Sequence, residues 1–209
     1  MHLYMAFVLT SAIVICTPGP TVLMVIADAL AHHKRHAWST VLGVGAGDLV
    51  AMSLSLAGAG AILRASAAAF TVLKVMGGLY LIYLGARSIF GARSLGRDLA
   101  ELEPGMAERS ALARFSAAFT VTVTNPKLIL FFVAFVPQFI ATTYSFVDQA
   151  AIYISTFDVM AMTNATLYAL VARTVGAKLT SARAQQHIHY VSGGILIAAG
   201  IFILVVKYR

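Results

Sequence analysis

The chain has 209 residues, of which 60% are hydrophobic and 11% charged, and its mean hydropathy is +0.86. A soluble domain of this size must turn most of its outer shell to water, so this composition excludes an ordinary soluble fold. The formal net charge of +7 would suit a nucleic-acid partner, but the positions of the basic residues indicate a membrane topology instead. We therefore expect the lipid bilayer, and no nucleic acid, as a partner.

Six apolar runs follow one another along the chain, each about as long as the roughly 20 residues of a membrane-spanning helix. They are Leu3–Leu30, Ala37–Leu63, Ala67–Phe90, Phe115–Ile140, Phe146–Ala172 and Ile188–Val206. The first run is too long for the apolar core of a signal peptide, and no Lys or Arg precedes it. The predicted fold class is an all-α integral membrane protein with six transmembrane helices.

One hydrophilic segment, residues 91–114, separates three of these helices from the other three. The predicted organisation is therefore residues 1–90 for the first three helices, a cytoplasmic linker at 91–114, and residues 115–209 for the last three. Numbering the loops alternately across the membrane places ten Lys and Arg residues on one side and three on the other. By the positive-inside rule the ten-charge side is cytoplasmic, which puts both termini outside.

The two halves of the chain share short similar segments in the same order. The pairs are Thr17–Leu23 with Thr124–Leu130, Gly47–Met52 with Phe157–Met162, and Lys74–Ile82 with His189–Ile197. Because each half has three helices, the second half enters the membrane from the opposite side. Such an inverted 3+3 repeat is a recurring plan of secondary transporters, in which the substrate site lies where interrupted helices of the two halves meet.

The interruptions fall in the first and fourth predicted helices, at Pro18-Gly19-Pro20 and at Asn125-Pro126. A proline inside a helix frees the carbonyl four residues earlier, which predicts free carbonyls at Val14, Cys16 and Thr122. Such carbonyls suit a substrate ammonium, and the start of the following half-helix suits a carboxylate. Two facing breaks would hold a zwitterion. The alternative is that the prolines only bend the helices for packing.

Charged residues within the apolar runs are the next candidates, because an ionisable group inside the membrane is costly and usually functional. Lys127 follows the second break, and Asp48 and Asp158 occupy matching positions in the second and fifth helices. A carboxylate shielded from water can take up a proton on one side and release it on the other. The alternative is a buried ion-pair network that only fixes helix packing.

Polar residues also form stripes along the two interrupted helices, which we interpret as walls of a polar path. The stripes are Thr10, Thr17, Thr21 and Asp28 in the first, and Ser116, Thr120, Thr124 and Lys127 in the fourth. Cys16 is the single cysteine, so an intramolecular disulfide is impossible and thiol-based electron transfer is disfavoured. The His-rich segment Ala31–His36 is expected to be an interfacial helix end, and no metal site is predicted.

The sequence resembles the LysE/RhtB family of bacterial amino-acid exporters along nearly its whole length. The resemblance is carried in order by "TPGPTVLMVIADAL", "LGVGAGDLV", "VLKVMGGLYLIYLGARSIF" and "TVTNPKLILFFVAFVPQFI". It implies a multi-pass protein of the bacterial plasma membrane that exports small amino acids or related metabolites, driven by protons, with a homodimer as a further implication. The hallmark positions of the family correspond here to Pro18, Gly19, Pro20, Asp48, Asn125, Pro126 and Lys127.

These observations predict a transporter with no enzymatic activity and no cofactor, which alternates between inward- and outward-open forms about its two breaks. The expected substrate-binding residues are Thr17, Pro18, Gly19, Pro20, Thr124, Asn125, Pro126, Lys127 and Asn164, with Asp48 and Asp158 coupling transport to protons. A transporter or channel for another small solute or a metal ion on the same scaffold is the alternative. Dispersed Met and His residues disfavour the metal.

Overall fold

The computed structural model describes residues 2–16, 19–31, 37–90, 110–140, 144–179 and 182–205, and every regular element within them is a helix. These elements are α1 (His2–Cys16), α2 (Pro20–Ala31), α3 (Ala37–Ala65), α4 (Ala67–Phe90), α6 (Ala111–Val123), α7 (Pro126–Ala134), the 3-10 helix η2 (Val136–Phe139), α8 (Phe146–Leu179) and α9 (Ala182–Val205). Thr17, Pro18, residues 32–36 and residues 91–109 of the predicted linker lie outside the described residues.

Two of the described helices are long and apolar enough to cross a membrane, namely Trp38–Ile62 within α3 and Thr71–Phe90 within α4. The number rises to four if each of two bent pairs counts as one span. The pair α1–α2 bends by 54° and the pair α6–α7 by 48°. The prediction of an all-α membrane protein with broken first and fourth helices is confirmed at this level, and the six-span inverted repeat stays a prediction.

The fourth helix begins earlier than its apolar run suggests. We expected the linker to extend to Arg114, but α6 begins at Ala111 because Ser110 caps it, accepting the backbone N–H of Ala113 at 3.2 Å. As a result Arg114 is not a loop residue. It lies inside the first turns of α6 with only 4% of its surface exposed.

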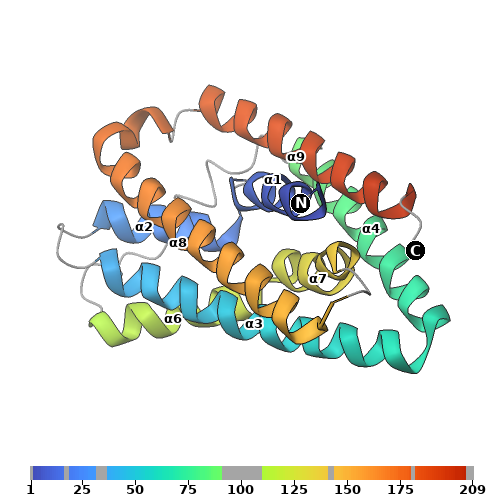
Figure 1. Ribbon diagram of the computed structural model, residues 1–209. Coiled ribbons are helices and arrows are strands. Elements are labelled where there is room, and N and C mark those ends of the chain that lie inside the picture. The colour runs from blue at the N-terminus through green and yellow to red at the C-terminus, as the bar shows by residue number, and fades with distance from the viewer. Residues whose placement is uncertain are drawn as a thin grey trace.

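The outer helices associate in pairs through small residues, with α4 along α9 and α3 along α6 (Figure 1). A Cβ atom placed on Gly85 of α4 would lie 2.5 Å from the carbonyl oxygen of Gly193 in α9, and one on Gly193 would lie 2.6 Å from that of Gly85. Larger residues would therefore force these two helices apart. Close approach through glycine is the common way for helices to associate in membranes, where burial of apolar surface gives no driving force.

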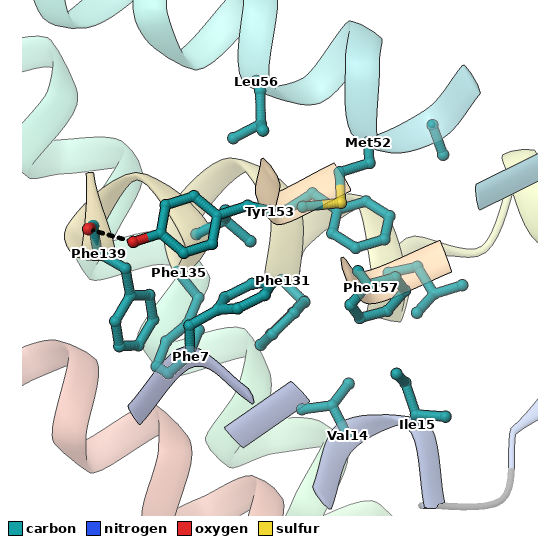
Figure 2. Packing of buried hydrophobic residues seen from close by; sticks show 14 of the residues in the cluster. Phe7, Val14, Ile15, Met52, Leu56, Phe131, Phe135, Phe139, Tyr153 and Phe157 are labelled. Carbon is teal, nitrogen blue, oxygen red and sulfur yellow. Dashed lines mark hydrogen bonds between the residues drawn. The ribbon is translucent and has the colours of Figure 1, made fainter. Parts of the chain in front are cut away.

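The described residues include two groups of buried apolar side chains. The first group, which we call the aromatic cluster, brings together Phe7 of α1, Phe135, Phe139 of η2 and Tyr153 of α8 (Figure 2). The rings of Phe7 and Tyr153 lie edge to face with centroids 4.5 Å apart, and the Tyr153 hydroxyl donates to the carbonyl of Phe139 at 2.7 Å. The second group, the small-residue cluster, joins Val25, Ala29, Val41, Val44, Ala118, Ala165, Ala169 and Ala172.

Candidate functional site

The two helix breaks lie against each other in the interior. The helices α2 and α7 each begin with a proline, Pro20 and Pro126, at the position where the missing N–H costs nothing. A Cβ atom on Gly19 in the first break would lie 3.3 Å from Nζ of Lys127 in the second. The sequence-based prediction that the breaks of the two halves meet therefore agrees with the described residues.

The last backbone carbonyl groups of α1 accept hydrogen bonds from side chains in the other half of the chain. Nζ of Lys127 donates to the carbonyl of Val14 at 3.2 Å. The Tyr168 hydroxyl donates to the carbonyl of Cys16 at 3.0 Å. These are the two carbonyls that the prolines were expected to free, and in this conformation both are occupied by the protein itself.

Asn164 completes this arrangement from α8, one helical turn before Tyr168. Its Nδ2 atom donates to the carbonyl of Ile15 at 3.1 Å, and its Oδ1 atom accepts a weak bond from Sγ of Cys16 at 3.7 Å. Three consecutive carbonyls of α1 thus have donors from α7 and α8. A substrate ammonium could reach the carbonyl of Val14 only if Lys127 moved away.

The second break is satisfied locally. Asn125 caps α7, because its Oδ1 atom accepts the N–H of Lys127 at 3.1 Å and its carbonyl accepts those of Leu128 and Ile129. Its own N–H donates to the carbonyl of Thr122 at 3.1 Å. Pro126 was expected to free that Thr122 carbonyl. This expectation is wrong for the present conformation, because the chain closes the carbonyl with a tighter turn.

Side-chain hydrogen bonds also connect the two breaks. Nδ2 of Asn125 donates to Oγ1 of Thr21 at 3.2 Å, and Thr21 also lies 3.5 Å from the hydroxyl of Thr122. Asn125 and Thr122 are both buried. The start of α2 is therefore linked to the second break by a short buried polar chain.

Between the breaks lies a small cavity of about 40 Å³. Because one buried water needs about 10–15 Å³ by this measure, the space suits a few water molecules. Its polar lining comes from Gly19, Thr21, Asp48, Asn125, Lys127 and Asn164, and its apolar lining from Ile15, Val22, Val25, Val44, Leu128, Phe157, Ala161 and Ala165. The polar residues come mainly from the breaks, and the apolar ones mainly from the helices around them.

Asp48 is the acidic residue of the cavity and is only 2% exposed. It interacts electrostatically with Lys127 and with Asp158. Among the described residues, neither the Oδ1 atom of Asp48 nor that of Asp158 has a hydrogen-bond partner. Asp158 comes from α8, and its Oδ1 atom would lie 3.3 Å from a Cβ atom on Gly45. Asp48 and Lys127 thus line the same small cavity, and Asp158 lies outside its lining but interacts electrostatically with Asp48.

The structure sorts the predicted site residues into three groups. Gly19, Asn125, Lys127, Asn164 and Asp48 line the cavity, whereas Thr17 and Pro18 lie outside the described residues. Pro20, Thr124, Pro126 and Asp158 are not part of the lining. The two prolines begin half-helices, and the hydroxyl of Thr124 donates to the carbonyl of Thr120 in its own helix at 2.7 Å.

Tyr168 was not among the predicted site residues. A signal for it was present, because it follows Asn164 by four residues and must share its helix face. Arg114 was likewise assigned to the linker, although a carboxylate in the first interrupted helix, Asp28, is its partner at 3.8 Å. In both cases the sequence does not show which residue of a distant helix is the partner.

A helical membrane protein in which two interrupted helices meet at a cavity with charged and polar side chains has the architecture of a membrane transporter. The family model named LysE type translocator matches residues 12–207, and the chain belongs to this family. This agrees with the resemblance seen in the sequence alone.

Individual relatives are similar over different lengths. The chain is 31% identical over 139 residues to a leucine efflux protein of Klebsiella pneumoniae, covering 66% of this chain and 63% of the relative. It is 30% identical over 141 residues to a leucine efflux protein of Salmonella typhimurium, covering 67% and 64%. The matches thus span less than two thirds of those efflux proteins. An uncharacterized membrane protein of Vibrio cholerae is 28% identical over 99% of this chain and 98% of its own. No solved structure matches.

Proposed function

We propose that this protein exports a small amino acid across the bacterial plasma membrane, by alternating access of a cavity between its two broken helices. The observation that carries the proposal is the meeting of the two breaks around Lys127 and Asp48. The six predicted spans, their inverted 3+3 relation, the external termini and a homodimer belong to the same proposal. Because 40 Å³ is too small for an amino acid, the helices must separate to admit one.

The lining favours a zwitterion with an aliphatic side chain as the substrate. Lys127 is the cation of the cavity and Asp48 its anion, so a substrate without net charge leaves the local balance unchanged. The apolar wall of Val25, Val44 and Phe157 suits a hydrocarbon side chain. Leucine is the first candidate, because two similar proteins are named for leucine efflux.

In this proposal Lys127 exchanges its bond with the Val14 carbonyl for a contact with the substrate carboxylate. The Val14 carbonyl then becomes an acceptor for the substrate ammonium, and Asn125 and Asn164 fix the remaining polar atoms. The displaced interaction is replaced by equivalent ones, so the exchange leaves neither Lys127 nor the Val14 carbonyl without a partner.

Asp48 and Asp158 are the proposed proton-coupling residues. Each has a buried oxygen without a hydrogen-bond partner among the described residues, which makes the ionised form costly unless a cation is near. Movement of Lys127 toward a substrate carboxylate removes compensating charge from Asp48. Proton uptake by Asp48 would then accompany substrate binding or release.

Leucine counterflow in proteoliposomes tests the transport proposal, because a carrier exchanges labelled for unlabelled substrate and a passive channel does not. The Asp48→Asn variant is expected to fold and to keep exchange, because the amide imitates the protonated acid. It should lose uptake into acid-loaded inverted vesicles. Asp148→Asn, which removes an exposed carboxylate, is the matched control. Wild-type uptake by Asp48→Asn would exclude Asp48 as the coupling group, and absence of counterflow for a whole amino-acid panel would exclude the transport proposal.

A further inference from the structure

A second buried polar cluster lies outside the lining of the cavity and has no role in the function proposed above. We call it the Asp28 cluster, and it consists of Asp28, Ser39, Thr40 and Arg114. The hydroxyl of Thr40 donates to Oδ2 of Asp28 at 2.6 Å, and Nε of Arg114 lies 3.8 Å from Oδ1 of Asp28 and 3.4 Å from Oγ of Ser39. Asp28, Thr40 and Arg114 are 2%, 1% and 4% exposed.

The cluster joins three helices at one end of the bundle. Asp28 comes from α2, Thr40 from α3 and Arg114 from α6, and these segments lie together at the left of Figure 1. α2 and α6 are the half-helices that flank the two breaks on this side, and they belong to different halves of the chain. The ion pair therefore fastens one half to the other near those ends of α2 and α6 that lie away from the two breaks.

The Asp28 cluster adjoins the cavity directly. Val25 and Val44 line the cavity, and they lie three residues before Asp28 and four after Thr40, which is about 4.5–6 Å along a helix. Both valines are also members of the small-residue cluster, whose other members surround the same helices. A solute moving from this end to the cavity would have to separate the ion pair and these apolar contacts.

A buried ion pair is a poor device for stability alone. Well-packed apolar residues in its place are often neutral or stabilising, whereas removal of one partner leaves a costly buried charge. The pair does have an advantage in a contact that opens. Water solvates the separated charges, whereas separated apolar side chains are only exposed to water.

We propose that the Asp28–Arg114 pair, held by Thr40, is the gate of the cavity on the predicted cytoplasmic side. The pair closes the path in the present conformation, and its separation lets α2 and α6 swing apart about the two breaks. At the other end the aromatic cluster closes the path with apolar contacts. The proposal rests on the transport function above, but its test does not depend on which solute is carried.

The test measures whether a thiol-reactive, membrane-impermeant maleimide reaches the cavity from each face. Cys16 is the single cysteine, so Cys16→Ser with Val25→Cys gives one thiol in the cavity wall, where Val25 is 2% exposed. With Asp28→Asn added, we expect labelling from the cytoplasmic face of inverted vesicles to rise about tenfold, equivalent to about 1.4 kcal/mol of lost closure. Asp148→Asn should leave the labelling rate unchanged.

A second variant keeps the test decisive if Asp28→Asn folds poorly. The double variant Asp28→Leu with Arg114→Met replaces the ion pair with apolar side chains, and we expect a stable protein that labels slowly and transports slowly. Unchanged labelling in Asp28→Asn, or wild-type transport by the double variant, would overturn the gate in favour of a purely structural pair. Faster labelling from the opposite face alone would also overturn it. A change in labelling without any amino-acid counterflow would support the gate and contradict only the amino-acid transport proposed above.

Discussion

The two helix breaks have similar sequences but are stabilised in opposite ways. At the end of α1 three consecutive backbone carbonyls accept hydrogen bonds from Lys127, Asn164 and Tyr168, all distant in sequence. At the start of α7 the backbone is satisfied by Asn125 and its neighbours. The backbone of the second break is therefore satisfied locally, whereas the described part of the first depends on the other half of the chain.

This difference indicates which break responds to events in the cavity. The donors to α1 include Lys127 and Asn164, which also line the cavity, so a ligand that attracts either side chain also releases α1. The cap of α7 uses the Asn125 Oδ1 atom, which can stay in place. Three sets of substitutions, at Lys127, at Asn164 with Tyr168, and at Asn125, test this comparison.

The largest effect is expected for Lys127→Met. It removes the donor to the Val14 carbonyl and the cation nearest Asp48 within the cavity lining. Truncating one partner of a buried charged contact typically costs about 2–5 kcal/mol, which corresponds to at least about a thirtyfold loss of apparent substrate affinity. Leucine counterflow at several substrate concentrations measures this loss.

Lys74→Met is the matched control, because Lys74 is also a buried lysine in an apolar helix but does not line the cavity. It should change transport little per amount of folded protein. If both variants lost transport equally, a buried lysine would be needed at either position, and Lys127 would have no specific role at the first break.

Local sequence signals predict where the two helix breaks lie but do not predict the partners of the first break. "TNPK" predicts the second break well, since Asn as the N-cap and Pro at the first helical position are local preferences. The prolines of "TPGP" likewise predict where α1 ends. The partners of the α1 carbonyls could not be predicted, because Lys127, Asn164 and Tyr168 come close only after the two halves have folded together.

The start of α6 was placed too late, after Arg114, because the sequence does not show contacts between distant helices. Hydropathy places the beginning of the apolar run at Phe115, and Arg114 is therefore predicted to be a loop residue. Ser110 as a cap was a visible local signal, but the burial of Arg114 depends on Asp28 in another helix. The apolar runs and the prolines thus predicted the helices and the breaks, whereas the buried charge pair could be recognised only from three-dimensional contacts.

An intermediate effect is expected when donors to α1 are removed from α8. Asn164→Ala and Tyr168→Phe each leave a carbonyl without its donor, which typically costs about 1–3 kcal/mol when the group is buried. The free energy of unfolding in detergent should fall accordingly, with a smaller loss for the more exposed bond of Tyr168. Because the two bonds hold adjacent carbonyls, the double variant is not expected to show a simple sum.

Thr163→Ala is the control for this pair. Thr163 precedes Asn164 on α8, and its hydroxyl donates to the carbonyl of Val159 in the same helix. The substitution should change the free energy of unfolding by no more than about 0.5 kcal/mol, as for most surface positions. If Asn164→Ala were equally mild, the first break would not depend on the second half of the chain.

The smallest effect is expected at the second break, where Asn125 makes both a local cap and a bond to Thr21. Asn125→Ala removes both, and loss of an N-cap alone costs about 1 kcal/mol. Asn125→Ser restores the cap, because the serine hydroxyl can accept the N–H of the following turn, but it cannot reach Thr21 as the longer amide does. We expect the serine variant to recover most of the free energy of unfolding that alanine loses. If serine is as unfavourable as alanine, the bond to Thr21 stabilises this break, and both breaks then depend on the opposite half of the chain.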